Sequence, residues 1–280
     1  MNVTLPDNKL YKKYKIMYAT IIGICIISLI LVIYSQFFEG KTVTTVGSLK
    51  GKSEEGYEIL KSEFDKLFTN TLQNYDDKYR NKKEKLNQDL VYTSYTKEEN
   101  QSNNYDLSIR IPYINIKGDT ASNYNEEIQN TFKQKADDIM KTTNKNSIYT
   151  VEYGAYIQDG VLSVIIRANL KEGSNAQRVI IKTYNYNLEE DKEITLQELI
   201  NMKSVDKSYV QNKIDEEIKS EQKKAEDLKA LGYSIFERNA NSEMYKLENV
   251  SEFYFHDGSI YIIFAYGNDK RTSEVDIAII

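Results

Sequence analysis

The stretch IYTVEYGAYIQDGVLSVIIRANL, residues 148–170, decides the fold. Two runs rich in β-branched and aromatic side chains flank Asp159-Gly160, a pair that readily adopts the positive φ angles of a two-residue hairpin turn. The sequence therefore predicts paired antiparallel strands over residues 148–157 and 161–170. A third strand is expected over residues 178–186.

Upstream of this hairpin, the same kind of pattern predicts strands over residues 90–95 and 105–116, with the polar residues 97–104 as the loop between them. Pro112 has no backbone donor and therefore predicts an edge strand or a β-bulge. A helix should begin at Asp119 or Thr120. Its predicted inward side chains share helical spacing and are Tyr124, Ile128, Thr131, Phe132, Ala136 and Ile139.

Downstream, Thr195-Leu196-Gln197-Glu198 has the spacing of a capping box and predicts a short helix. A longer helix is expected to begin at Ser204 and to end near Gly232. Its predicted inward side chains share helical spacing and are Val205, Tyr209, Val210, Ile214 and Ile218. Strands over residues 253–255, 260–266 and 275–280 complete the chain, with a turn at Asp257-Gly258.

These elements predict an α+β fold with two small domains of antiparallel strands packed with helices, residues 88-190 and residues 191-280. An amphipathic helix over residues 53-87 should precede them, because Ser53 can cap it and the charged run 76–85 can continue it as a solvated face. Its apolar side chains recur every three or four residues: Tyr57, Leu60, Phe64, Leu67, Phe68, Thr71, Leu72 and Tyr75. This face packs on the domain, forms a stalk, or acts as an oligomerisation seam.

Residues 16-38 form an almost unbroken apolar run without a charge. As a helix, this run would extend about 35 Å, which exceeds a hydrocarbon core of about 30 Å. The sequence thus predicts a transmembrane helix over residues 16-38, which contacts membrane lipid. It also predicts a tail over residues 1-15 and a polar linker over residues 39-52.

Four lysines precede the span, whereas Glu39 follows it directly, so the positive-inside rule places the N-terminus in the cytoplasm and the body outside the cell. The alternative is a cleaved signal peptide. Against it, the apolar run exceeds the usual 7 to 15 residues, and bulky side chains occupy the exit at residues 34–38. We expect a single-pass signal anchor in the cell membrane with an extracytoplasmic body.

The cysteine content and the charge narrow the class of protein. Cys25 is the sole cysteine and falls within the predicted span, so the body folds without an internal disulfide, as in many Gram-positive envelope proteins. Beyond residue 38, the chain carries 33 basic and 41 acidic side chains. This excess of negative charge disfavours phosphate backbones, and nucleic acid is not expected as a partner.

The sequence offers little for catalysis. His256 is the single histidine and is expected to be an exposed turn residue, and no Gly-x-Ser-x-Gly turn is present. The cluster Glu189-Glu190-Asp191 could act on a glycoside or hold calcium, but a solvated turn accounts for it better. We therefore predict no enzymatic activity, no catalytic residues, no metal and no cofactor. The ligand-binding residues are unknown from the sequence.

The order of several motifs resembles RsiV-type extracytoplasmic proteins, the lysozyme-sensing anti-sigma factors, in which a deacetylase-associated domain precedes an RsiV-like C-terminal domain. The first half resembles the former domain through Ile111-Pro112-Tyr113 with Gly118, the helix over 125–132 and the Asp159-Gly160 turn. The second half resembles the latter domain. The residues that carry this likeness are 194–200, the helix after Ser204, Phe253-Tyr254-Phe255, Asp257-Gly258 and Tyr266.

Two features depart from that family. Its anti-sigma members carry a long cytoplasmic segment, whereas about 15 residues precede the span here. The family also shows a stretch with Pro and Ala after its last Tyr, where this chain has Gly267-Asn268-Asp269-Lys270-Arg271-Thr272.

We expect a membrane-anchored extracytoplasmic binding or sensing protein that recognises a cell-envelope component, such as peptidoglycan, or an extracellular protein such as lysozyme. An acidic body would attract a cationic protein at long range. The alternatives are an envelope hydrolase that uses carboxylates and a structural envelope assembly protein that oligomerises.

Overall fold

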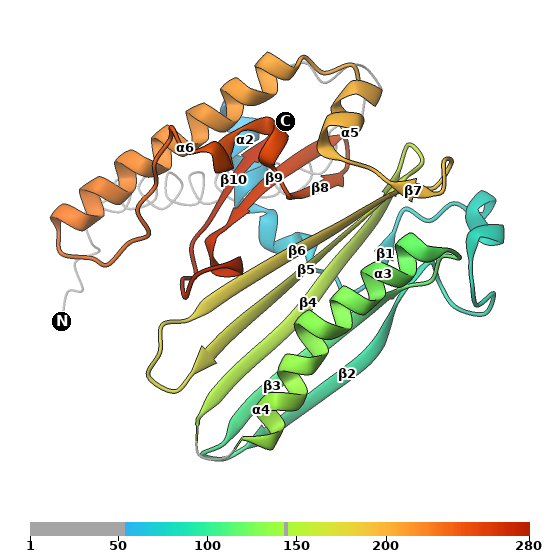
Figure 1. Cartoon of the computed structure of the whole chain (residues 1–280), viewed down its shortest axis with the longest axis horizontal. Helices are drawn as coiled ribbons and strands as arrows, with labels where there is room; N and C mark the ends of the chain where they lie inside the picture. The colour runs from blue at the N-terminus through green and yellow to red at the C-terminus, as the bar shows by residue number, and fades with distance from the viewer. Residues whose placement is uncertain (1–53, 143–144) are drawn as a thin grey trace, which may run out of the picture. The chain divides into compact units, whose positions relative to one another are not determined.

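The computed structural model describes residues 54–142 and 145–280, which belong to one unit, Leu49–Ile280 (Figure 1). The predicted tail, transmembrane helix and linker, including Cys25, lie outside the described residues. Within the part of the chain that is described, no helix combines the length and the apolar character needed to cross a membrane.

The larger sheet is built around the predicted hairpin. Its strand order is β2-β3-β4-β5-β6-β7, and β1 pairs with β4 beside this path. The strand bounds are β1 Leu72–Gln73, β2 Val91–Gln101, β3 Tyr105–Ile114, β4 Ser147–Gln158, β5 Val161–Glu172, β6 Arg178–Asn187 and β7 Lys192–Glu193. The turn between β4 and β5 is confirmed, because Asp159 has a φ of 51° and Gly160 a φ of 80°.

The β2–β3 hairpin is longer than predicted. Residues 97–101 pair with Ile109 to Tyr105, so the expected loop over 97–104 is wrong except at residues 102–104. These polar residues belong to an edge strand, whose outer side chains face water. The predicted bulge at Pro112 is confirmed, since the register shifts between Thr93, its partner, and Tyr95.

Strands β3 and β4 run parallel, as do β1 and β4, so the prediction of purely antiparallel strands is wrong at β4. The physical reason is the helical crossover that joins β3 to β4: a helix returns the chain to the end at which it started. The crossover comprises α3 Asp119–Ile128, the π-helix η3 Gln129–Lys133 and α4 Gln134–Lys141. The predicted helix face is buried in the core of the large sheet, except that Thr131 is half-buried.

A smaller antiparallel sheet has the order β10-β9-β8, with β8 Glu252–His256, β9 Ser259–Ala265 and β10 Val275–Ile279. One face packs on α5 Leu196–Met202 and α6 Lys207–Ala230. The other face packs on side chains of β5 and β6 from the large sheet. Short 3-10 helices connect these elements: η4 Glu243–Tyr245, η5 Leu247–Asn249 and η6 Tyr266–Asn268.

The first residues of α5 and α6 are set by N-capping side chains. The capping box at Thr195 and Glu198 is confirmed. The start of α6 at Ser204 is wrong, because Asp206 is the N-cap and accepts a hydrogen bond from the Tyr209 amide at 2.9 Å. Ser204 instead adopts a φ of 53° in the preceding turn.

The predicted helix over 53-87 is wrong beyond Ser62. The structure has α2 Glu54–Ser62, η1 Phe64–Leu67 and η2 Asp77–Lys82, with β1 between the two 3-10 helices. Asn70 adopts a φ of 58° and exchanges hydrogen bonds with the backbone of Tyr153 in β4, at 2.7 and 3.0 Å. These bonds replace the helical ones. The side chains of residues 64, 67 and 68 are buried between the sheets, as the packing alternative predicts.

The predicted boundary between residues 88-190 and 191-280 falls in the turn between β6 and β7. Buried hydrogen bonds cross it, since Asn185 in β6 donates to the Phe253 carbonyl at 2.9 Å and Ser163 in β5 accepts from the Phe255 amide at 3.4 Å. The division into two domains stays a prediction.

Candidate functional site

An open hollow of about 700 Å³ lies beside the turn between β4 and β5. Three segments supply its lining: residues 74–79, the turn residues 157–160, and Glu189 just after β6. It is a cleft between loops that a well-packed pair of strands holds in place, which is where binding residues commonly lie.

The segment 74–79 is delivered to the hollow by its pairing with β4. Leu72 and Gln73 lie opposite Ala155 and Tyr156 in parallel register. Asn74 then turns the chain with a φ of 57°, and its side-chain amide donates to the Ile157 carbonyl at 2.6 Å. Asp76 caps η2 by accepting a hydrogen bond from the Lys78 amide at 3.0 Å.

The Asp159-Gly160 turn is fastened on both sides. Lys203, which follows α5, forms an ion pair with Asp159. The Gly160 carbonyl accepts a hydrogen bond from the Leu188 amide at 2.7 Å. Gln158 accepts one at 2.8 Å from the amide of Gly258, in the β8–β9 turn. The turn therefore has a fixed place between both sheets.

Tyr79 and Glu189 lie beside Gly160 and complete the lining. The Tyr79 hydroxyl donates to Glu189 at 2.9 Å, and the Lys78 ammonium lies 3.6 Å from the same carboxylate. Burial and the hydrogen bond to Glu189 raise the pKa of Tyr79, so the hydroxyl remains a donor at neutral pH. Gly160 is needed here: besides its φ of 80°, an added Cβ would lie 3.1 Å from Glu189 Cγ.

The hollow is acidic. The described residues that line it include four carboxylates, at Asp76, Asp77, Asp159 and Glu189, and one ammonium, at Lys78. The carboxylates of Asp76 and Glu189 are more than half exposed and lie 4.0 and 3.6 Å from the exposed ammonium of Lys78, so these two pairs are weak and exchange easily with another cation. Asp159 is held by Lys203. Asp77 forms no ion pair with a described residue. A cation 4 Å from one carboxylate gains about 1 kcal/mol in water and about 4 kcal/mol at an effective dielectric constant of 20.

Of the candidate residues named from the sequence, the acidic hollow includes Glu189. The run Glu189-Glu190-Asp191 is an exposed turn, as predicted, but Glu189 also lines the hollow. The prediction that His256 is an exposed turn residue is wrong, because it ends β8 and is half-buried with its ring 4.2 Å from that of Tyr156. Among the described residues, no three His, Cys, Asp or Glu side chains form a metal-binding group.

Residues 76–79 were missed because the sequence assigned them to a helix. Asn70 and Asn74 are the signal that could have ended the predicted helix before them, since asparagine tolerates the left-handed backbone conformation better than most residues.

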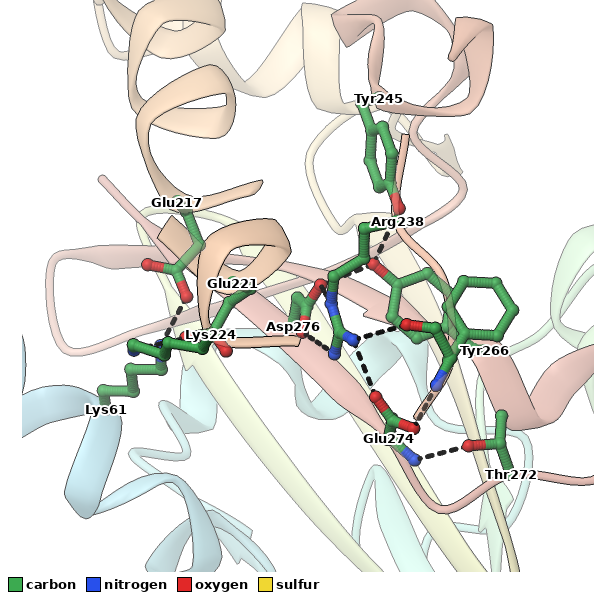
Figure 2. Close-up of polar contacts among 11 residues, drawn as sticks. Lys61, Glu217, Glu221, Lys224, Arg238, Tyr245, Tyr266, Thr272, Glu274 and Asp276 are labelled. Carbon is green, nitrogen blue, oxygen red and sulfur yellow. Dashed lines mark hydrogen bonds and ion pairs between the residues drawn. The ribbon is translucent and has the colours of Figure 1, made fainter. Parts of the chain in front are cut away.

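A second polar cluster surrounds the buried side chain of Arg238 (Figure 2). The guanidinium, 5% exposed, makes two hydrogen bonds of 2.7 Å to Asp276, which is 1% exposed, and one of 2.7 Å to Glu274. Tyr266 donates to the same Asp276, and its hydroxyl lies 2.8 Å from that of Tyr245. Burial opposes the charge of Arg238, but the bonds to Asp276 outweigh it and raise the arginine pKa. This cluster ties the segment after α6 to β10.

A neighbouring ion-pair group joins α2 to α6 (Figure 2). Lys61 pairs with the buried Glu217 and, at 3.0 Å, with Glu221. The Tyr57 hydroxyl lies 2.9 Å from Glu217 and 3.0 Å from the carbonyl oxygen of Ile277 in β10. The group docks α2 on the body, and its polar atoms are satisfied within the fold.

No family model matches the chain, and no curated protein matches it. Solved structures show similarity, and two of them are DUF3298 family proteins. A member of the DUF3298 family from Bacteroides fragilis NCTC 9343 is 13% identical, with 62% of this chain and 80% of that chain covered and a TM-score of 0.35. A DUF3298 family protein from Pseudomonas aeruginosa PAO1 is 10% identical, with the same coverage and a TM-score of 0.34. The RsiV-type identity stays a prediction.

Proposed function

We propose that this chain is a membrane-anchored extracytoplasmic binding protein, and that the acidic hollow beside the Asp159-Gly160 turn receives a cationic group of an extracellular protein. The observation that carries this proposal is the charge of the hollow, where four carboxylates face one lysine. A lysine or arginine side chain of a partner would replace the weak internal pairs of these carboxylates.

The chemistry of the lining also favours recognition over catalysis. Its walls carry carboxylate and side-chain amide oxygens, which accept hydrogen bonds from an ammonium or guanidinium group. The predicted span over residues 16-38 and the charges around it support the placement of this body outside the membrane.

Lysozyme is a suitable first probe because it is a cationic extracellular protein, and because the sequence resembles lysozyme-sensing proteins. The experiment immobilises the full chain in detergent and measures lysozyme binding at several salt concentrations. We expect saturable binding that weakens as salt screens the acidic hollow. Envelope extract and purified peptidoglycan serve as parallel probes.

The hydrolase alternative predicts a different result in the same preparation. Release of soluble fragments from peptidoglycan, lost on Glu189→Gln, would support a carboxylate hydrolase and overturn the binding proposal. Absence of saturable binding to lysozyme, extract and peptidoglycan would overturn it as well.

A further inference from the structure

A second hollow, of about 350 Å³, lies at the other end of the long strands, beside the turn that joins β5 to β6. A smaller hollow of about 100 Å³ adjoins it and shares Glu172 and Arg271. Figure 1 shows this turn at the end of β5 opposite the Asp159-Gly160 turn. The twelve residues of β5 separate the two ends by roughly 36 Å, so the hollows are independent sites.

The charge of this second hollow is opposite to that of the first. Lys135 from α4, Lys145 before β4, Arg178 at the start of β6 and Arg271 before β10 all line it or its smaller neighbour. The carboxylate in the two linings is that of Glu172. Four cations therefore face one anion, in a chain whose net charge is −5.

Glu172 does not neutralise these cations. Its carboxylate accepts a hydrogen bond from Lys135 at 2.8 Å, whereas Arg271 lies 4.0 Å away and is 62% exposed. Lys145 forms no ion pair with a described residue. The hydrogen bond from Lys135, together with the charges of Arg271 and Lys145, lowers the pKa of Glu172, as expected where positive charge is in excess.

The loop that carries Arg271 is held firmly against β6. Arg178 donates to the carbonyl oxygens of Gly267 and, at 2.6 Å, of Asn268. The amide of Val179 donates to the Thr272 carbonyl at 3.0 Å. Gly267 permits this approach, because an added Cβ would lie 1.7 Å from the Val179 carbonyl oxygen. The backbone that carries Arg271 is thus fixed beside β6.

Among the described residues, Arg178 has no carboxylate partner, and its side chain donates instead to two neutral carbonyl oxygens. The stretch 267–272, which departs from the pattern of the RsiV-type family, has a role in this arrangement: it brings Arg271 to the β5–β6 turn.

We propose that this basic hollow binds a phosphate group, with Arg271 and Lys145 as its principal ligands and Lys135 as a third cation. Guanidinium and ammonium groups form strong charge-assisted hydrogen bonds with phosphate oxygens. A phosphate carries enough charge to compete with Glu172 for Lys135. The group can belong to a soluble phosphate or polyphosphate, or to a lipid headgroup.

The test uses the full chain in detergent and measures the binding of tripolyphosphate by calorimetry at low salt. We expect saturable binding, at least tenfold weaker in the double variant Arg271→Ala, Lys145→Ala. The matched control, Lys207→Ala with Lys219→Ala, removes the same charge from exposed positions of α6 and should keep the affinity of the unaltered chain. Unchanged thermal unfolding of the double variant shows that it is folded.

A third variant distinguishes binding of tripolyphosphate at the basic hollow from a general effect of the charge of the chain. Glu172→Gln removes the competing carboxylate, and we expect several-fold tighter binding of tripolyphosphate. Equal losses in the double variant and its control, or no binding of the unaltered chain to either tripolyphosphate or phosphatidylglycerol, overturn the proposal. A parallel measurement in the same detergent, with soluble short-chain phosphatidylglycerol against short-chain phosphatidylcholine, identifies the source: binding that depends on Arg271 only in this lipid arm assigns the site to a lipid headgroup.

Discussion

The imidazole of His256 lies against the rings of Tyr156, at 4.2 Å between centroids, and Tyr254, at 5.8 Å. Burial lowers its pKa below the ordinary value of 6.5, although the charge of Asp257 opposes this. In the interval between the lowered pKa and 6.5, the unfolded chain binds a proton that the folded chain does not. The free energy of unfolding therefore rises with pH across this interval and falls on acidification.

This linkage gives a residue-scale prediction. In the full chain in detergent, the NMR titration of its single histidine should report a pKa below 6.5. His256→Gln should reduce the change of thermal midpoint with pH just below 6.5. A pKa of His256 at or above 6.5 would contradict the burial of its imidazole against Tyr156 and Tyr254.

Arg238 gives a second prediction at this scale. Arg238→Ala leaves Asp276 buried without its partner, and loss of one member of a buried pair costs about 3 to 5 kcal/mol in the free energy of unfolding. Urea denaturation measures this loss. The control is Lys229→Ala, which breaks an exposed pair with Glu237 and should cost less than about 1 kcal/mol. Similar losses of unfolding free energy in the two variants would show that the buried cluster does not stabilise the fold.

At the scale of elements, the contact between β4 and the segment after α2 depends on Gly154. An added Cβ at this position would lie 2.0 Å from the carbonyl oxygen of Leu67, a backbone atom that cannot rotate away. We expect Gly154→Ala to lower the free energy of unfolding by about 1 to 3 kcal/mol or more. Gly232→Ala is the control: its Cβ meets nothing within 4 Å, and only its φ of 90° opposes the change. A smaller loss at Gly154 than at Gly232 would contradict the close contact.

The elements that the sequence predicted well are those specified locally. The turns at Asp159-Gly160 and Asp257-Gly258 and the capping box at Thr195 depend on a few adjacent residues, and all three are present. The helix over 53-87 failed beyond Ser62 because distant partners compete for its residues. Asn70 bonds to Tyr153, and the hydrogen bonds of a strand there replace those of a helix. The parallel pairing of β3 with β4 also depends on residues far apart in the chain.

In the candidate site, too, the locally specified parts were predicted from the sequence and the parts that depend on distant residues were not. The turn residues of the acidic hollow were placed as a turn by the sequence, and Glu189 was placed in the exposed turn that it occupies. Asp76 and Asp77 could not be assigned to it, because a parallel pairing of β1 with β4 brings them there. No local pattern in the sequence encodes that pairing.

At the scale of the whole molecule, the proposed topology places the body outside the membrane. With Cys25→Ser to remove the sole cysteine, an introduced Ser242→Cys should react with a membrane-impermeant maleimide on intact cells. Ser242 is chosen because it precedes η4, outside the large sheet. Labelling that requires cell lysis would place the body in the cytoplasm and would contradict the proposed topology.

The described body also has charge of opposite sign at its two hollows: four carboxylates and one lysine at one end of β5, four cations and one carboxylate at the other. Long-range attraction by net charge alone would act on any cationic protein, so the specific claim concerns where such a protein docks. A charge-matched comparison separates the two effects.

The most direct measurement is the affinity of the full chain for lysozyme in two triple variants that remove the same charge. One variant is Asp76→Asn, Asp77→Asn, Glu189→Gln in the acidic hollow; the other is Asp106→Asn, Glu126→Gln, Asp227→Asn at exposed positions elsewhere. Our account predicts that the first loses at least about tenfold in affinity, roughly 1.4 kcal/mol, while the second stays within about threefold of the unaltered chain. Equal affinities in the two variants would contradict it.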